Sequence, residues 1–350
     1  MKNLFKRYNH WPLFFLVIII LILGFRQYIF PTINDSFANS DSSFMVVCFN
    51  PTYYNALLPW FSMEKKIEKY TGIKIVHKTL VNVAKLQYQM QHNFGDVWIT
   101  SLDNAAKALD NGAKFKILMV MGWKKWTLIS KLSEDELFHS KEKIIYYPEY
   151  TNSGIKVLKN IIAQDKSKIK FVPLNIRVLI DKLLKKEIDT ALLQTPLSTF
   201  ILMQKNQEFV TIQTLENLYT EKSGKYTKLP WTVLSVREEW AKKNPNIIKM
   251  ILTEQQKETY MINIAPIQEV VELWPEKFHE DISPAIIEEM ISNEKLLTLP
   301  AYKEENEIKD LLKILSPNIK YDSKMIWQKN DLAIAEIRAE GNSKTKKEFK

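Results

Sequence analysis

The chain has 350 residues, of which 46% are hydrophobic and 25% charged, and its formal net charge is +9. This composition excludes a disordered chain, and the length allows about two domains. The single cysteine, Cys48, excludes an intramolecular disulfide. We predict that its side chain is buried, because it lies in an apolar run. The chain has no basic block with interleaved aromatic residues, so the sequence does not predict nucleic-acid binding. The positive charge favours instead an anionic membrane surface or an acidic ligand.

An apolar run at residues 13–25 follows a basic segment at the start of the chain. A basic segment before an apolar run is typical of an export signal. The run is shorter than the roughly 20 residues of a spanning helix, although residues 28–30 could lengthen it. We therefore predict that residues 1–30 are either a cleaved signal peptide or an uncleaved hydrophobic helix that anchors the protein in the inner membrane. Both alternatives place the remainder in the periplasm or another extracytoplasmic space, after a polar linker at residues 31–43.

After the linker, short apolar runs alternate with amphipathic stretches. The predicted order is strand 44–49, helix 55–70, strand 73–77, helix 82–92, strand 96–100, helix 103–111 and strand 116–121. Gly72 and Gly112 follow two of these helices, where glycine readily adopts the left-handed conformation of a helix cap. This alternation favours a parallel sheet with helices on its faces.

A second set of elements has a similar size, and a mostly helical region follows it. The predicted strands of this set are 126–130, 143–147, 169–172, 189–193, 209–212 and 232–236, and its helices are 153–164, 174–186 and 196–205. The later helices are 237–242, 245–263, 266–273, 284–292 and 303–315. Two sets of this kind predict an α/β protein with two lobes, built from mostly parallel sheets that helices flank.

The predicted division places residues 44–124 and 237–315 in lobe 1 and residues 125–236 in lobe 2, with a partly disordered C-terminal extension at 316–350. Crossovers near 122–128 and 228–236 would then join the lobes. Gly122 would give the first crossover backbone freedom.

Polar residues follow several predicted strands at the points where helices begin, in the loops 50–54, 100–104, 150–154 and 194–198. In an open α/β sheet such loops meet at the carboxyl edge, where ligands bind. Helix N-termini there offer N–H groups and a positive dipole end, which suit an anion or a carbonyl group. Helix capping alone is the alternative explanation for any one of these loops.

Aromatic residues border the same loops. Tyr53, Tyr54 and Trp231 lie in predicted loops, and we expect them to line a pocket. Trp98 and Trp126 lie inside predicted strands, and we expect them in the core.

The sequence shows no catalytic motif. Its 5 histidines are scattered, and it has no phosphate-binding loop, dinucleotide fingerprint or nucleophile elbow. We therefore predict a protein that is not an enzyme and that binds no cofactor or metal.

In the order and spacing of its elements the chain resembles the type II periplasmic solute-binding proteins, in particular the branch that binds nitrate, sulfonate, taurine and thiamine pyrimidines. The segments that carry the resemblance are 61–75, Asp96-Val97-Trp98-Ile99-Thr100-Ser101 with the helix after it, 111–117, Ile188-Asp189-Thr190-Ala191 with Pro196, 229–240 and Asn244-Pro245. The resemblance covers residues 44–315. Two departures are a Gln194-Thr195 pair in place of a frequent acidic residue and the absence of the cysteine-rich motif of the related pyrimidine synthases.

The resemblance implies a monomer of two lobes that closes on a small anion or a polar heterocycle and delivers it to an ABC permease. By motif position, the ligand-binding residues would be Tyr53, Tyr54, Ser101, Thr151, Asn152, Ser153, Thr195 and Trp231. Three alternatives remain open. They are a membrane-tethered sensor or assembly protein with a degenerate site, an enzyme on the same fold, and an iron-binding relative that uses adjacent tyrosines such as Tyr146 and Tyr147.

Overall fold

The computed structural model describes most of the chain after the predicted linker. The described residues are 44–80, 83–139, 143–149, 153–162, 169–204, 208–224, 228–280, 282–329 and 331. The predicted leader (1–30), the linker (31–43) and the end of the chain beyond 331 lie outside them, as do Thr151 and Asn152. Within the described residues, none of the helices is both long and apolar enough to cross a membrane.

Six strands form the first sheet, in the order β11-β4-β10-β3-β1-β2. They are β1 (Phe44–Phe49), β2 (Lys74–Thr79), β3 (Val97–Ser101), β4 (Phe115–Gly122), β10 (Thr232–Arg237) and β11 (Leu299–Pro300). β1 pairs in parallel with β2 and β3, whereas β10 runs antiparallel to β3 and β4. The central strands β3 and β4 are buried along nearly their whole length, which explains their almost continuous apolar sequences.

Five strands form the second sheet, in the order β7-β6-β8-β5-β9. They are β5 (Trp126–Ser130), β6 (Lys143–Pro148), β7 (Ile169–Leu174), β8 (Thr190–Gln194) and β9 (Val210–Thr214). β6 pairs in parallel with β7 and β8, and β5 runs antiparallel to β8 and β9. This arrangement repeats the β2-β1-β3-β10-β4 part of the first sheet, strand for strand.

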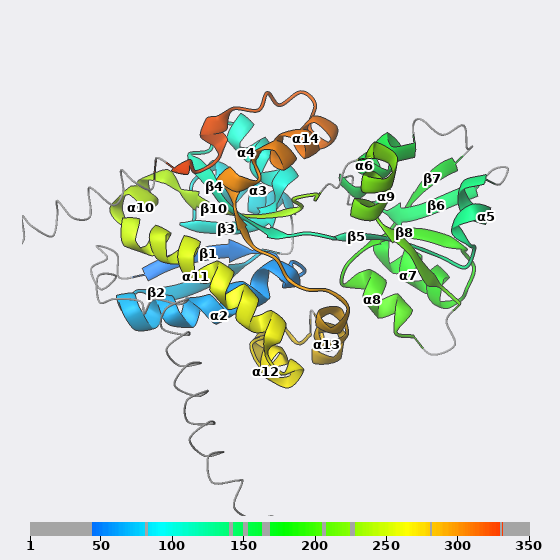
Figure 1. The fold of residues 1–350 in the computed structure, drawn as a ribbon, viewed down its shortest axis with the longest axis horizontal. Coiled ribbons are helices and arrows are strands. Elements are labelled where there is room, and N and C mark those ends of the chain that lie inside the picture. Colours follow the sequence, from blue (N-terminus) through cyan, green and yellow to red (C-terminus); the bar gives the residue numbers. More distant parts are fainter. Residues whose placement is uncertain are drawn as a thin grey trace, which may run out of the picture.

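The two-lobed α/β fold predicted from the sequence is confirmed, with two differences in the sheets (Figure 1). The sheets are mixed rather than mostly parallel, because each contains one strand, β5 or β10, that arrives from the other lobe and runs against its neighbours. The strand at 232–236 was predicted with the second set, but as β10 it lies in the first sheet. Sequence order alone could not assign it, since it follows the second set directly along the chain.

Helices cover both faces of each sheet. Around the first sheet they are α2 (Tyr54–Thr71), α3 (Val83–Gln91), α4 (Leu102–Asp110), α10 (Glu238–Lys243), α11 (Pro245–Ile264), α12 (Ile267–Val271), α13 (Pro284–Asn293) and α14 (Glu305–Leu315). Around the second they are α5 (Glu134–His139), α6 (Ser153–Ile162), α7 (Ile176–Leu184), α8 (Leu197–Leu202) and α9 (Leu215–Ser223). The helices α5 and α9 were not predicted from the sequence. Gly72 and Gly112 end α2 and α4 with positive φ values of 70° and 85°, as predicted.

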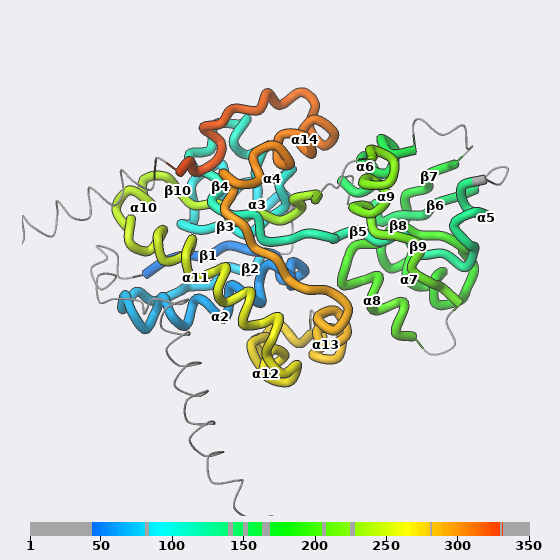
Figure 2. The backbone as a smooth tube through the Cα atoms, in the orientation of Figure 1, coloured from blue at the N-terminus to red at the C-terminus, as the bar shows by residue number. Residues whose placement is uncertain are grey.

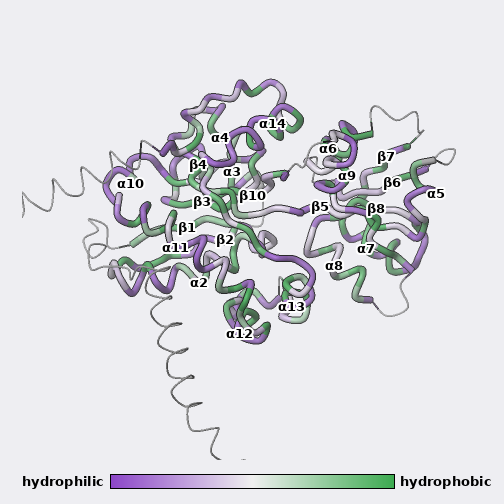
Figure 3. Tube along the Cα trace, in the orientation of Figure 1, coloured by the Kyte–Doolittle hydropathy of each residue, from purple (hydrophilic) through white to green (hydrophobic). Residues whose placement is uncertain are grey.

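The apolar side chains form one core within the first lobe, a second core that runs from the first lobe into the second, and a smaller core within the second lobe. In Figure 3 the hydrophobic residues follow β1, β3 and the inner parts of the helices. Cys48, Trp98 and Trp126 are all buried, which confirms the three core predictions, and burial raises the pKa of the Cys48 thiol to about 12.

Two short segments connect the lobes. Residues 123–125 lead from β4 to β5, and residues 228–231 lead into β10. The segments are joined at the first sheet, where the Trp231 amide donates to the Gly122 carbonyl at 3.0 Å. Gly122 lies at the start of the first crossover, and its packing gives a further reason for a glycine at this position. A Cβ there would lie 2.6 Å from the Thr232 side chain, so close packing requires the glycine.

Later parts of the chain also touch both lobes. Figure 2 shows the chain running from α13 along the first lobe to α14. α13 contacts α8, and α14 contacts α6, so the first lobe meets the second at two further places. The Lys156 ammonium of α6 donates to the Leu315 carbonyl at the end of α14. Residues 316–329, within the predicted extension, return to β4, where Ile326 bridges to Ile117.

Candidate functional site

The carboxyl ends of β1 and β3 bring together two of the predicted site residues, Tyr53 and Ser101. Tyr53 lies just before α2, and its hydroxyl has Ser101 and Thr100 as hydrogen-bond partners. Burial raises the pKa of this hydroxyl, so it stays protonated at neutral pH. Ser101 caps α4 by accepting a hydrogen bond from the Asn104 amide at 3.3 Å. Ser101 therefore caps a helix, as the alternative explanation predicted, and its predicted role in ligand binding stays a prediction.

A buried lysine lies against the same tyrosine. The Lys125 ammonium is 4.2 Å from the centroid of the Tyr53 ring, and the residue is only 7% exposed. Among the described residues, no carboxylate pairs with this ammonium. Burial lowers the pKa of Lys125 to about 7, since removing the charge from water is costly.

Thr195 meets the first crossover from the second lobe. Its amide donates to the Lys125 carbonyl at 2.9 Å, at the end of β8. Thr195 thus lies beside the backbone of Lys125, which brings a third predicted residue to this place.

Ser153 begins α6 and is half-buried. The next residue, Gly154, packs against the indole of Trp126, and a Cβ at this position would lie 2.4 Å from the ring. The glycine therefore allows the start of α6 to approach β5 closely. Thr151 and Asn152, which precede it, lie outside the described residues and stay predictions.

Tyr54 and Trp231 have different partners from Tyr53. The Tyr54 hydroxyl donates to Glu294 Oε2 at 3.4 Å, so the two adjacent tyrosines do not share a partner. Trp231, only 2% exposed, donates from its indole Nε1 to Glu216 Oε1 at 2.7 Å. Both residues lie in a second group of polar residues around Glu216 and Glu294, and their predicted place in the lining of a pocket stays a prediction.

The sequence reasoning missed Lys125, Glu216 and Glu294. Lys125 had a visible signal, because two lysines interrupt an otherwise apolar stretch at the predicted crossover, 122–128. Glu216 and Glu294 had none, since each is one acid among many and only the fold places them near the crossovers. Among the described residues, no group of three side chains could hold a metal ion.

The fold is similar to solved structures of ABC-transporter binding components. One, described as an ABC transporter from Parabacteroides distasonis, has a TM-score of 0.64 at 14% identity, over 82% of this chain and 100% of that one. The zinc-bound ligand-binding component of an ABC-type import system from Staphylococcus aureus has a TM-score of 0.63 at 12% identity, over 84% and 99%. The periplasmic aliphatic sulphonate binding protein of Escherichia coli has a TM-score of 0.61 at 13% identity, over 82% and 93%. No protein-family model matches the chain, and no curated protein matches its sequence. The chain therefore has the fold of the two-lobed solute-binding proteins, as its sequence predicted.

The residues around Lys125 are suited to bind an anion and leave it chemically unchanged. A buried ammonium without a counter-ion gains strongly from an anion that reaches it. The Ser101 hydroxyl is a further possible donor, and the start of α4 adds the positive end of a helix dipole. The cation–π contact with the Tyr53 ring orients this ammonium.

Proposed function

We propose that the protein is the extracytoplasmic solute-binding subunit of an ABC import system and that it captures a small anion between its lobes. The observation that carries the proposal is Lys125, a buried ammonium without a carboxylate partner among the described residues, at the segment that joins the lobes. The ligand-binding residues would be Tyr53, Ser101, Lys125, Ser153 and Thr195, with Thr151 and Asn152 as further predicted donors.

The charge at this place favours an anion over an uncharged heterocycle. The face of Tyr53, which would stack on a flat ligand, is covered by the Lys125 ammonium instead. One of the similar structures is an aliphatic sulphonate binding protein, and a sulphonate would suit a buried lysine with hydroxyl donors.

Binding would follow hinge closure. An anion that contacts Ser101 in the first lobe, Lys125 in the crossover and Ser153 in the second lobe shifts the population toward the closed form, because only that form brings all three together. The closed protein would then deliver the anion to a membrane permease. The predicted leader, residues 1–30, would place the protein outside the cytoplasm, and an uncleaved leader would hold it at the inner membrane. The protein would catalyse no reaction.

A thermal-shift panel on the purified full chain tests the proposal. The anions are nitrate, sulfate, ethanesulfonate and taurine, and the uncharged control is ethanol. A ligand at 100 times its Kd stabilises the folded state by about 2.7 kcal/mol. We expect at least one anion to raise the Tm in a concentration-dependent manner and ethanol to have no effect. If no anion raises the Tm, the anion-binding function is wrong, and a sensor or assembly role with a degenerate site becomes the better explanation.

A further inference from the structure

A single buried carboxyl group connects both crossovers. Glu216, the second residue of α9, is 5% exposed. Its Oε1 accepts hydrogen bonds from the Lys124 amide at 2.5 Å and from the Trp231 indole at 2.7 Å. Lys124 belongs to the first crossover and Trp231 to the second, so the Glu216 carboxyl group holds the two crossovers together.

The same carboxyl group also fixes the residue that we propose to bind the anion. The Glu216 bond holds the amide of Lys124, whose φ of 45° is in the left-handed region that a lysine rarely adopts. The next residue is Lys125, and the direction of its side chain depends on this backbone. Glu216 is therefore a positioning residue for Lys125, since it does not need to touch the ligand itself.

The other oxygen of this group has no partner. Glu216 Oε2 is buried without a hydrogen bond among the described residues. A buried carboxylate oxygen without a donor is costly, and a proton on the carboxyl group removes the charge. If water reached the group when the lobes separate, this cost would disappear.

We propose that Glu216 binds a proton when it clamps the two crossovers and releases it when the lobes open, so that ligand capture is coupled to proton uptake. This inference rests on the hinge closure of the proposed function. It names a regulation of that site, through a residue in the crossover region.

The charged groups around Glu216 support this assignment. Burial raises the pKa of Glu216 to about 7, although the Trp231 indole, the Lys124 amide and the Lys124 ammonium each lower it. Glu294, from the first lobe, interacts with the Glu216 charge. Burial together with this charge raises the pKa of Glu294 to about 8. The nearby Tyr54 hydroxyl donates to Glu294. Because burial raises the pKa of both groups, and the Glu216 charge further raises that of Glu294, the two carboxyl groups hold at least one proton between them near neutral pH.

The direction of the pH effect follows from proton linkage. In open, hydrated surroundings the pKa of Glu216 would return toward its ordinary value of 4.5. The clamped form then binds more protons than the open form between about pH 4.5 and pH 7. It is favoured at the acidic end of this interval, and the advantage is lost as the pH rises through the pKa of the clamped form. We therefore expect opening and ligand release to increase as the pH rises toward about 7 and to level off above it.

The distance between spin labels on the two lobes tests the coupling without any ligand. Labels are attached to the full chain at Glu239→Cys and Lys185→Cys, which are exposed positions in the first and second lobe. Cys48 is fully buried and stays unlabelled. We expect the distance distribution of the otherwise native protein to shift to longer distances between pH 5.5 and pH 8.5, with a midpoint near the pKa of Glu216, about 7.

Three variants identify the group that titrates. In Glu216→Gln, which keeps an oxygen acceptor and a similar shape, we expect the shift to disappear while the circular dichroism spectrum stays native. In Trp231→Phe we expect the midpoint to move to higher pH, because the indole N–H that lowers the pKa of Glu216 is lost. In Lys125→Met, the control for the buried lysine, whose pKa is also about 7, we expect the shift to persist.

A pH-independent distance in the native protein, or an unchanged shift in Glu216→Gln, overturns the coupling. A shift that is lost in Lys125→Met but not in Glu216→Gln also overturns it and assigns the titration to Lys125. None of these results depends on anion binding, so failure of the coupling and failure of the proposed function remain distinguishable.

Discussion

The two lobes share a sheet topology but hold equivalent aspartates in different ways. Asp96 directly precedes β3 in the first lobe, and Asp189 directly precedes β8, its counterpart in the second. In each lobe the carbonyl of the aspartate accepts a hydrogen bond from a basic residue at the end of the crossing strand. These bonds are from Arg237 to Asp96 and from Lys131 to Asp189, both at 2.9 Å.

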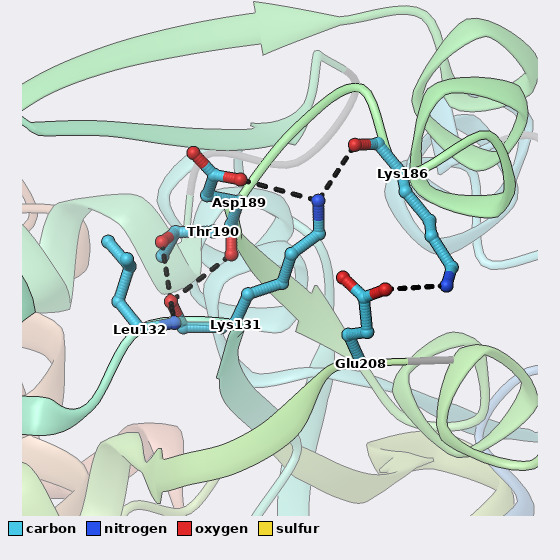
Figure 4. Close-up of polar contacts among 7 residues, drawn as sticks. Lys131, Leu132, Lys186, Asp189, Thr190 and Glu208 are labelled. Carbon is cyan, nitrogen blue, oxygen red and sulfur yellow. Dashed lines mark hydrogen bonds and ion pairs between the residues drawn. The ribbon is translucent and has the colours of Figure 1, made fainter. Parts of the chain in front are cut away.

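The side chains of the two aspartates differ in their surroundings. The Asp96 carboxylate is buried, forms an ion pair with Arg237 and accepts from the Val46 amide of β1 at 2.9 Å. The Asp189 carboxylate is 67% exposed and pairs with Lys131 at 3.3 Å, while the Lys131 ammonium also donates to the Lys186 carbonyl at 2.7 Å (Figure 4). Asp96 therefore connects β3 with β1 and β10 in the first lobe. The Asp189 carboxylate contacts Lys131 at the surface of the second lobe. The shared topology sets the fold, whereas individual side chains set how rigid each lobe is.

The largest effect expected from this comparison is on Asp96. In Asp96→Ala the half-buried Arg237 side chain and the Val46 amide lose their buried partner, and we expect the free energy of unfolding to fall by about 3 kcal/mol. In Asp189→Ala we expect a loss below about 1 kcal/mol, as is usual for an exposed pair. Urea denaturation of both variants measures the difference. Equal losses would contradict the unequal roles of the two aspartates.

A smaller effect is expected where the second lobe packs most tightly. In Gly154→Ala the new Cβ overlaps the Trp126 indole, so α6 must shift away from β5. We expect a loss of about 2 kcal/mol from overpacking, measured by thermal unfolding. Ser153→Ala, one residue earlier, serves as the control, and we expect it to change stability by less than about 0.5 kcal/mol. A neutral Gly154→Ala would show that α6 is not held against β5.

Two helix caps, one in each lobe, give the smallest effect on stability. Ser101 caps α4 and Thr214 caps α9, where it accepts from the Asn217 amide at 3.3 Å. Replacement of either by alanine should cost about 1 kcal/mol. Only Ser101→Ala should also weaken anion binding, because Ser101 contacts Tyr53 beside Lys125. Calorimetric titration of both variants separates capping from binding, and equal affinities would remove Ser101 from the site.

Periodicity and turn residues predicted most of the fold from the sequence. The alternation of apolar runs and amphipathic stretches located the helices α2, α4 and α11 to within one or two residues. It could not assign β10 to the first sheet, because pairing partners far apart in the sequence leave no local signal.

The site was predicted less completely. Loops after strands predicted the meeting of Tyr53 with Ser101 and the place of Thr195, since the carboxyl ends of strands gather at one edge. The partner of each side chain was not predictable. The indole N–H of Trp231 donates to Glu216. The Lys125 side chain is buried, which is rare for lysine and which composition cannot indicate.

Calorimetric titration of Lys125 variants tests the central claim most directly, with the anion that gives the largest thermal shift. We expect Lys125→Met to weaken binding about 30-fold or more, because a charge-assisted contact is lost, and Lys125→Arg to retain part of the affinity. Lys114→Met, which removes an exposed lysine at the opposite edge of the first sheet, should bind as the native protein does. The native affinity should fall as the pH rises above the Lys125 pKa of about 7, and Lys125→Met should lose the part of this pH dependence that comes from the lysine. Native affinity in Lys125→Met would contradict an anion site built on this lysine.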